Sequence, residues 1–292
     1  MLISEIFKKK KCVYSFEIFP PKATFPIETI YDTLEALSGL KPDYISITYG
    51  AGGTKSDNRT IELANLVKNK YNTPSLAHLT AIHSDKEGVT AFLKEMQANS
   101  LRNILALRGD KVEGMPLSKD FRYASDLAKF ISQYRDFHIS GACYPEGHYE
   151  SPDLETDIEN LKIKIDNGVC HLNTQLFFDN KDFYKFIELA RKKGIGVPVQ
   201  AGVMPILNKR QIERIVSLSG VKIPAKFSRL IALYGDSDED MKKAGTDYAI
   251  NQIVDLIQNG ADGIHLYIMN NAALARAVTS AVSPYIERIN AK

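Results

Sequence analysis

A glutamate inside an apolar run is the first residue of this sequence that could do acid–base chemistry. Glu17 lies between Phe16 and Ile18, in a stretch rich in aromatic and β-branched residues that two prolines end. An ionised carboxylate among aromatic rings is costly unless it is paired or protonated. A carboxyl group whose pKa is raised by such surroundings suits a general acid. The simpler alternative is an edge strand on which Glu17 faces water.

The sequence Arg108-Gly109-Asp110 is a second candidate, for ligand binding. It follows the short apolar run from Ile104 to Leu107, which is typical of a strand buried on both faces. Gly109 lets the backbone turn tightly or approach a ligand closely. In parallel α/β folds ligands bind at the carboxyl ends of strands, where Arg108 and Asp110 would place opposite charges. A plain glycine turn, with Asp110 capping the next helix, is the alternative.

Polar side chains also follow several other apolar runs. These positions are Thr48, His78, Tyr144 with His148, and Gln175. A buried histidine is often a satisfied core residue, and a buried amide can simply bond to the backbone. Their repeated place at the carboxyl ends of strands is a stronger signal than any one of them, because a barrel would bring these ends to a single mouth.

Two further patterns could bind a charged group. The glycines within residues 50–53 precede a predicted helix at 57–70, so their N–H groups could bind an anion. Their spacing matches neither the dinucleotide fingerprint nor a P-loop, and a flexible turn explains it equally well. On a later predicted helix, Asp157, Asn160 and Lys164 recur three and four residues apart and share one face. A solvated helix face is the alternative.

These side chains must be positioned by strands and helices that alternate along the chain. We predict strands at 12–21, 43–49, 76–80, 103–107, 138–144, 171–178, 197–205 and 262–270. Helices are predicted at 28–40, 57–70, 86–99 and 123–134, from 153 onward, around 211, twice within 224–259, and at 272–289. With no hairpin signal, this order predicts the α/β class and a (β/α)8 TIM barrel with extra helices before the last strand. A doubly wound open sheet is the alternative.

Composition and charge limit the class of protein. The chain has 292 residues, of which 44% are hydrophobic and 25% charged, which is ample for a large core. Barrels of this length form one domain, and no linker divides the sequence, so we expect a single (β/α)8 catalytic domain over 1–292. The net charge of +2 does not favour nucleic acid or membrane partners. The lysines at 8–11 are expected to form a solvated edge.

Neither a signal peptide nor a membrane span is evident in the sequence, so we expect a cytoplasmic protein. The three cysteines, Cys12, Cys143 and Cys170, lack the close spacing of a zinc or redox site. We therefore expect free thiols and no bound metal.

Seven short motifs follow one another along the chain. They are Ser-Phe-Glu-Ile-Phe-Pro-Pro-Lys at 15–22, Ile-Thr-Tyr-Gly-Ala at 47–51, His-Leu-Thr at 78–80, Leu-Arg-Gly-Asp at 107–110, Tyr-Ala-Ser-Asp at 123–126, Tyr-Pro-Glu-Gly-His at 144–148 and Thr-Gln-Leu-Phe-Phe at 174–178. With these motifs in this order, the chain resembles bacterial methylenetetrahydrofolate reductases over essentially its whole length. The resemblance implies a (β/α)8 flavoprotein of the catalytic-domain-only type.

That resemblance also implies an activity. Such an oxidoreductase uses FAD and NADH or NADPH to reduce 5,10-methylenetetrahydrofolate to 5-methyltetrahydrofolate, in one-carbon metabolism and methionine biosynthesis. The flavin gives hydride to a one-carbon unit held as an iminium ion, and opening the folate ring to that ion needs a proton on the leaving nitrogen. We also expect the chain to form a homo-oligomer.

Roles carry over residue by residue. Glu17 matches the general acid, and Asp110 matches a carboxylate that lies beside the flavin and also meets the folate. Positions that hold FAD in the family match Thr48, Tyr49, Ala51, His78, Leu107, Arg108, Gly109, Asp110, Tyr123, Ala124, Tyr144, His148, Asp157, Asn160 and Lys164. Positions that contact the folate match Glu17, Asp110, Gln175, Gln211 and Asn271.

Three positions depart from the family pattern. Ile215 stands where a phenylalanine often packs on nicotinamide or folate, Asn271 where an arginine is usual, and Ile163 where a basic residue lies beside the FAD helix. The electron donor therefore stays open between NADH, NADPH and a protein. One alternative function is a flavin-binding subunit of a larger electron-transfer complex. Another is a barrel that binds folate and transfers methyl groups without flavin.

Overall fold

A closed parallel barrel forms the centre of the computed structural model, which describes residues 1–21, 24–49 and 59–291. Its strands are β1 Val13–Ile18, β2 Tyr44–Ile47, β3 Ser75–Thr80, β4 Asn103–Leu107, β5 His138–Cys143, β6 His171–Thr174, β7 Val199–Val203 and β8 Gly263–Tyr267. Each strand pairs in parallel with the next, and β8 closes the barrel on β1 with Val13 opposite Gly263. The predicted (β/α)8 barrel is confirmed, and the open-sheet alternative is wrong.

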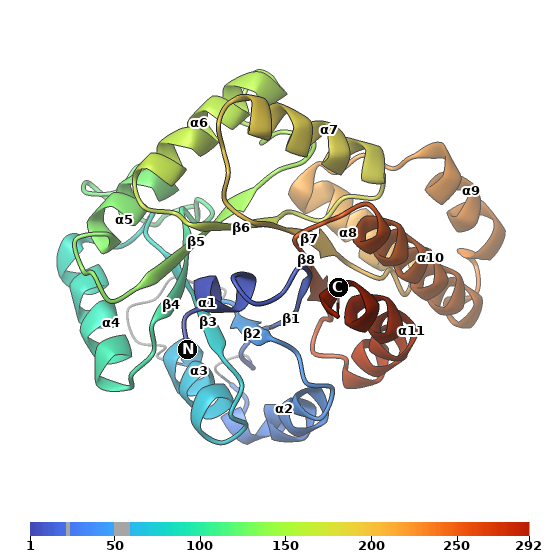
Figure 1. Cartoon of the computed structure of the whole chain (residues 1–292), viewed down its shortest axis with the longest axis horizontal. Coiled ribbons are helices and arrows are strands. Elements are labelled where there is room, and N and C mark those ends of the chain that lie inside the picture. Colours follow the sequence, from blue (N-terminus) through green and yellow to red (C-terminus); the bar gives the residue numbers. More distant parts are fainter. Residues whose placement is uncertain (22–23, 50–58, 292) are drawn as a thin grey trace.

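Helices surround this barrel as an outer ring (Figure 1). They are α2 Tyr31–Ser38 after the 3-10 helix η1 Ile27–Ile30, α3 Arg59–Asn69, α4 Lys86–Ala98, α5 Ala124–Ile131, α6 Leu154–Asp166, α7 Asn180–Lys192, α8 Lys209–Ser219, α9 Ala225–Tyr234, α10 Asp238–Gln258 and α11 Ala272–Asn290. Helices α8, α9 and α10 separate β7 from β8, which confirms the predicted extra helices. Within the part of the chain that the structure describes, no helix is both long and apolar enough to cross a membrane.

The amino-terminal helix α1, Ile3–Phe7, was not predicted from the sequence and lies across the centre of the ring (Figure 1). Ile3 and Ile6 pack on Tyr44, Leu76 and other apolar side chains at the amino ends of the strands. The backbone N–H of Ile3 donates to Oδ1 of Asn103 at 3.0 Å. This helix therefore covers the amino end of the barrel, so a ligand of the barrel interior approaches from the carboxyl end.

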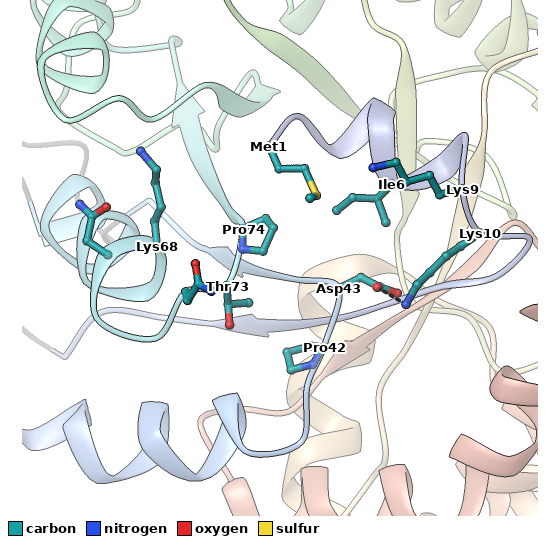
Figure 2. Close-up of a pocket in the computed structure, with 11 residues that line it drawn as sticks. Met1, Ile6, Lys9, Lys10, Pro42, Asp43, Lys68, Thr73 and Pro74 are labelled. Carbon is teal, nitrogen blue, oxygen red and sulfur yellow. Dashed lines mark hydrogen bonds and ion pairs between the residues drawn. The ribbon is translucent and has the colours of Figure 1, made fainter.

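A cavity of about 520 Å³ lies beside α1 at this amino end (Figure 2). Its lining includes Met1, Ile6, Lys9, Thr73 and Pro74, and none of the residues predicted for the functional site. The lysines at 8–11 are exposed as predicted, and Nζ of Lys10 reaches the carboxylate of Asp43 at 2.5 Å. This cavity is thus at the opposite end of the barrel from the predicted chemistry.

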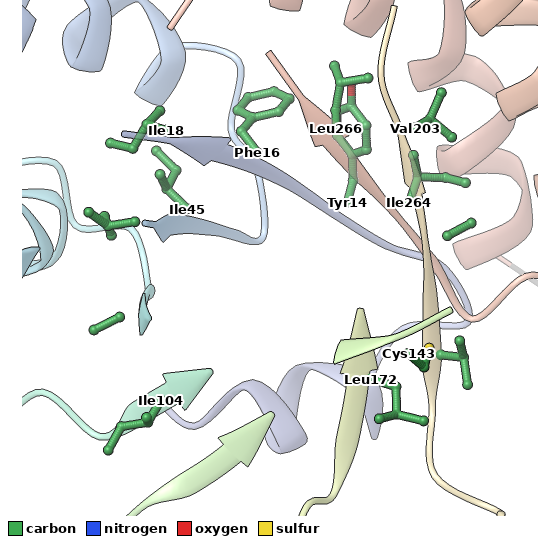
Figure 3. Packing of buried hydrophobic residues seen from close by; sticks show 14 of the residues in the cluster. Tyr14, Phe16, Ile18, Ile45, Ile104, Cys143, Leu172, Val203, Ile264 and Leu266 are labelled. Atoms are coloured by element: carbon green, nitrogen blue, oxygen red, sulfur yellow. The ribbon is translucent and has the colours of Figure 1, made fainter. Parts of the chain in front are cut away.

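Period-two alternation along the strands separates an apolar outer layer from a polar interior. Figure 3 shows outward side chains such as Phe16, Ile18 and Leu266, which pack beneath the helices. Burying a side chain the size of Phe16 contributes roughly 2–3 kcal/mol. Inward positions carry the polar and ionisable side chains Ser15, Glu17, Tyr44, Ser46, His78, Asn103, His138, Ser140, His171, Asn173, Gln200, His265 and Tyr267. Most barrels fill this space with branched apolar residues, so the polar interior is a distinctive feature of this chain.

Several predicted elements extend beyond the observed ones. The strand predicted at 12–21 ends at Ile18, and the strand predicted at 171–178 ends at Thr174. Gln175 still donates its backbone N–H to the carbonyl oxygen of Cys143 at 2.8 Å, but the phenylalanines that follow turn into the apolar clusters around the barrel. Apolar composition predicts burial correctly here, but it does not say where the backbone pairing stops.

Candidate active site

Glu17 points into the barrel from β1, because its neighbours Phe16 and Ile18 take the outward positions. Its Oε2 atom lies 3.4 Å from Nε2 of His265 and 3.6 Å from Nε2 of His78. The Glu17 side chain is 22% exposed, whereas that of His265 is 0% exposed. The carboxylate is therefore reached from the open end and is held by buried imidazoles. A closed barrel has no edge, so the edge-strand explanation of Glu17 is wrong.

The charge state of Glu17 follows from these neighbours. Burial raises the pKa of its carboxyl group, but the hydrogen bond from His265 and the proximity of His78 outweigh burial, so the pKa lies below its ordinary value. The raised pKa expected from the sequence is wrong for these surroundings, because the aromatic neighbours point away from the carboxylate. Burial lowers the pKa of His78 to about 4, so that imidazole is neutral at pH 7. A proton on Glu17 thus requires a change of surroundings, such as a ligand that excludes water.

A hydrogen-bonded chain determines which nitrogen of His265 carries the proton. The amide nitrogen of Gln200 donates to two backbone carbonyl oxygens of β1 and β8, each at 3.2 Å, which fixes the orientation of the amide. The same nitrogen donates to Oγ of Ser15 at 3.0 Å. The ionised carboxylate of Glu17 can only accept, so its hydrogen bond with His265 requires a proton on Nε2 of that ring. Nδ1 of His265 lies 2.7 Å from Oγ of Ser15 and can then accept from this hydroxyl.

A second group of side chains gathers at the rim beyond β4 and β5. The rings of Tyr144 and His148 meet edge to face with their centroids 4.7 Å apart. Nζ of Lys164, on α6, reaches in to donate to the backbone oxygen of Ala142 at 3.0 Å. Burial lowers the pKa of Lys164, and the nearby carboxylate of Asp157 opposes this effect. Lys164 and Asp157 of α6 thus lie near the Tyr144–His148 pair.

Arg108 joins this rim group from the end of β4. Its guanidinium forms an ion pair with Glu150 and lies 3.5 Å from the hydroxyl of Tyr149. The sequence suggested that Arg108 and Asp110 would present opposite charges together. Arg108 is instead paired with Glu150, on the loop between β5 and α6, a residue to which the sequence pattern assigned no role.

Gly109 and Asp110 form a tight turn at the same rim. Gly109 has φ of +88°, and a Cβ atom there would lie 2.9 Å from Cβ of Thr80. A glycine is therefore required both by the backbone conformation and by the close approach to β3. The Asp110 side chain is exposed. Burial, followed by the charge of Asp157 and a smaller effect of Asp110, raises the pKa of the Tyr144 phenol to about 12.

Other residues predicted to hold FAD lie at the end of β2. The backbone oxygen of Thr48 accepts a hydrogen bond from Oγ1 of Thr60 at 3.0 Å. The ring of Tyr49 packs against Phe92 of α4, with centroids 6.0 Å apart, so its side chain belongs to the outer layer. Ala51 and the surrounding glycine-rich segment lie outside the described residues.

The remaining predicted FAD positions are spread around the rim. Leu107 is half-buried and packs towards the apolar cluster beneath α1. Tyr123 precedes the first residue of α5, Ala124, and is 49% exposed. Asn160 is exposed on α6. None of these three side chains contacts Glu17 through a hydrogen bond in the described chain.

The three amides predicted to meet the folate each bond to their own loop. Oε1 of Gln175 accepts from the next backbone N–H at 2.9 Å, and Oε1 of Gln211 accepts from that of Leu207 at 2.9 Å. Oδ1 of Asn271 accepts from the backbone N–H of Leu274 at 3.0 Å and caps α11. These bonds fix the amide oxygens, so the NH₂ groups of Gln175 and Asn271 point away from the backbone N–H groups that the oxygens contact.

The departures from the family pattern have different surroundings. Ile215 is 8% exposed and packs in an apolar cluster with Ile212, Phe227 and Met241. Ile163 is 51% exposed on α6. Ile215 is thus a core residue of the α8–α10 region, whereas Ile163 adds only a solvated apolar side chain near the rim.

A smaller cavity of about 260 Å³ opens at the carboxyl end of the barrel. It is lined by Tyr144, Glu146, His148, Gln175 and Lys222, among others. The backbone N–H of Lys222 donates to Glu146 at 2.9 Å, which joins the loop after β5 to the loop after α8. Its lining thus brings together Tyr144 and His148, predicted to bind FAD, and Gln175, predicted to bind folate.

Sequence reasoning missed the residues that support Glu17. His265, Ser15 and Gln200 are buried, and the pattern assigned none of them a role. A signal was present, because alternation in β8 places His265 on the same face as Gly263 and Tyr267. What the sequence does not show is that this face meets Glu17, since β1 and β8 become neighbours only when the barrel closes.

Comparison with known proteins gives consistent matches. The family model for methylenetetrahydrofolate reductase matches residues 2–283. Methylenetetrahydrofolate reductase 1 of Schizosaccharomyces pombe is 34% identical over 287 residues, which cover 96% of this chain and 46% of that protein. The 5,10-methylenetetrahydrofolate reductase of Escherichia coli is 33% identical over 264 residues, which cover 90% of this chain and 88% of that protein. The chain therefore spans about half of the yeast relative and most of the bacterial one.

A solved structure shares the fold. It is an uncharacterized protein from Clostridium thermocellum that binds two copies of 5-methyl-5,6,7,8-tetrahydrofolic acid. The TM-score is 0.67 at 15% sequence identity, and the match covers 99% of this chain and 100% of that chain.

Proposed function

Because the chain belongs to the methylenetetrahydrofolate reductase family, we propose that it reduces 5,10-methylenetetrahydrofolate to 5-methyltetrahydrofolate with NADH or NADPH as donor. The observation that carries the proposal is the Glu17 carboxylate, held by His265 and His78 at the open end of the barrel. We place the reaction there and take residues 1–292 as one catalytic domain. Its product would supply methyl groups for methionine biosynthesis in the cytoplasm.

Glu17 acts as the acid in this proposal. Opening the five-membered ring of the substrate leaves an iminium cation on one nitrogen and requires a proton on the other. Glu17 delivers that proton, and a ligand that covers the mouth raises its pKa by removing water. The carboxylate of Asp110 stabilises the cationic iminium carbon through its negative charge. Hydride addition at that carbon then gives the methyl group, so one hydride and one proton balance the reduction.

The chemistry of the rim residues fits FAD. Arg108 and Lys164 supply two cations for a diphosphate, and Asp157 and Asn160 supply acceptors and donors for ribose or adenine. We propose the same binding role for Thr48, Tyr49, Ala51, His78, Leu107, Gly109, Asp110, Tyr123, Ala124, Tyr144 and His148. Tyr49 can contribute through its backbone, because its ring is packed against Phe92. When bound, the flavin supplies hydride transfer from the nucleotide to the one-carbon unit.

Gln175, Gln211 and Asn271 bind the folate in this proposal. Their amide oxygens are already engaged by backbone N–H groups, so Gln175 and Asn271 offer NH₂ donors to a polar ligand. An uncharged donor at Asn271 would bind a carboxylate more weakly than an arginine does.

The packing of Ile215 keeps a second candidate function open. In the described structure it faces the apolar cluster of α8–α10 rather than a free surface that a nicotinamide ring could stack on. We therefore retain the alternative in which the barrel is a flavin-binding subunit that receives electrons from a protein partner. The two candidates share the folate chemistry and differ in the electron donor.

Anaerobic titration of the purified protein tests this proposal. Acid precipitation should first release FAD, and Lys164→Ala should lower the amount of FAD that purifies with the protein. NADH or NADPH should then bleach the flavin absorbance, and methylenetetrahydrofolate should restore it with formation of 5-methyltetrahydrofolate. Release of FMN, or of no flavin, would contradict the cofactor.

The same titration separates the two candidates. The protein-partner alternative would be favoured if dithionite, but neither nucleotide, bleaches the flavin and folate then restores its colour. Failure of folate to restore the flavin colour would contradict both functions.

A further inference from the structure

The loop that carries Asp110 is held by one imidazole from the neighbouring loop. His83 lies between β3 and α4, and its Nδ1 is 2.9 Å from the backbone oxygen of Pro116. Its Nε2 accepts from the backbone N–H of Val112 at 3.2 Å and lies 3.2 Å from the backbone oxygen of Asp110. One ring therefore touches three points of the segment that follows Gly109.

These contacts select one tautomer of the neutral ring. The N–H of Val112 can only donate, so neutral His83 presents a lone pair at Nε2 and carries its proton on Nδ1. That proton is donated to the oxygen of Pro116, which can only accept. If the ring is protonated on both nitrogens, Nε2 donates to the oxygen of Asp110 instead. The bond to Pro116 persists in both charge states, so the ring stays anchored to the loop.

The rest of the segment has little else to hold it. Residues 110–117 are exposed, apart from a half-buried Met115. At its start, the backbone oxygen of Arg108 accepts from the backbone N–H groups of Ala81 and Ile82. Ser118, at its end, donates its N–H to Ile82 at 2.6 Å. Between these ends, within the described chain, the hydrogen bonds and ion pairs to other segments are those of His83 and one contact of 3.9 Å between Lys111 and Glu150.

From this arrangement we propose that His83 is a positioning residue for Asp110. It acts through the loop, since its ring contacts the backbone of residues 110, 112 and 116 and makes no hydrogen bond to the Asp110 side chain. The inference rests on the proposed function, in which Asp110 stabilises a cation on the substrate. The position of that charge matters because displacement by about 1 Å can cost on the order of a hundredfold in rate.

A double-mutant cycle tests whether His83 acts through Asp110. His83→Ala should slow folate-dependent reoxidation of the reduced protein about tenfold to a hundredfold. In an Asp110→Asn background the same change should have less than about a twofold effect, because the charge to be positioned is already absent. His83→Gln should recover most of the rate, since its amide offers an acceptor for Val112 and a donor for Pro116. Glu113→Ala, an exposed change on the same loop, serves as the matched control.

Hydrogen exchange provides a readout that does not depend on the reaction. The amide of Val112 should exchange faster in His83→Ala than in the wild type and should regain protection in His83→Gln. If protection of the Val112 amide is unchanged in His83→Ala, His83 does not hold the loop. This conclusion stands even if the protein reduces no folate. Equal rate losses from His83→Ala with and without Asp110→Asn refute positioning through Asp110. If the wild-type protein does not reduce folate, only the proposed function is contradicted. The exchange measurement still tests whether His83 holds the loop.

Discussion

Replacing Glu17 by glutamine should slow the folate step and leave flavin reduction intact. Glutamine has nearly the same shape, and its Oε1 can still accept the proton that His265 presents on Nε2. It has no proton to give to the leaving nitrogen of the folate. Transfer of hydride from a nicotinamide nucleotide to the flavin needs no such proton, so the two half-reactions should separate.

The structure sets the size of the effect. General acid catalysis is commonly worth about 10²–10⁴-fold. Tyr267 also points into the barrel, but burial and the charge of Glu17 raise the pKa of its phenol well above the ordinary value, and its hydroxyl donates to the backbone oxygen of Thr174 at 2.7 Å. Because this phenol is a poor acid, we expect a loss of at least about a hundredfold. The stability change should stay within about 1 kcal/mol, since the acceptor for His265 is retained.

Stopped-flow absorbance measures the two steps separately. Flavin bleaching with NADH, or with dithionite if nucleotides do not react, should be close to the wild-type rate. Recolouring with methylenetetrahydrofolate should be slow. Glu35→Gln, an exposed change on α2, is the control for loss of a carboxylate. Equal slowing of both phases in Glu17→Gln would show that Glu17 has a structural role, and the acid would then have to be another group at the mouth.

Three further predictions follow from the site. Asp110→Asn should slow recolouring by roughly 10²–10³ while FAD stays bound, and wild-type recolouring would contradict its electrostatic role. Gly109→Ala should lower the free energy of unfolding by about 1–3 kcal/mol in urea denaturation, because alanine is strained at φ of +88° and its Cβ would press on Thr80; an unchanged midpoint would refute this. Burial lowers the pKa of His78 and of His138 to about 4, against roughly 6.5 in an unfolded chain. Since the unfolded chain then binds more protons, the free energy of unfolding should be full above about pH 6.5 and decline towards pH 4, by up to about 3 kcal/mol for each histidine. Urea midpoints that do not change between pH 7.5 and pH 5 would contradict this linkage.

The barrel itself was predictable from short-range patterns. Apolar runs such as Ile104 to Leu107, separated by helical spacing, predict strands and helices in the right order because each element buries its own outward face. Boundaries were less predictable. Gln175 was placed inside a strand that ends at Thr174, since a buried residue just past a strand has the same composition as one within it. Helix α1 was missed because its five residues are too few to show a period.

The candidate site was only partly predictable. Glu17, His78 and Asp110 were identified as ionisable residues at strand ends, and the structure brings Glu17 and His78 within 3.6 Å. The pairing of Arg108 with Glu150 was not predicted, because 42 residues and two loops separate them in the chain. Nor was the lowered pKa of Glu17, which depends on His265 rather than on its sequence neighbours.

Side-chain alternation is a local property of the extended backbone, so residue order alone specifies which residues could do chemistry and on which face of each strand they stand. Tertiary structure alone decided their partners. Closure of β8 on β1 brings His265 to Glu17 across 248 residues, and Ser15 and Gln200 then orient its proton. Hydrogen bonds and charge effects act over a few ångströms, so the protonation of this site depends on contacts that exist only in the folded barrel.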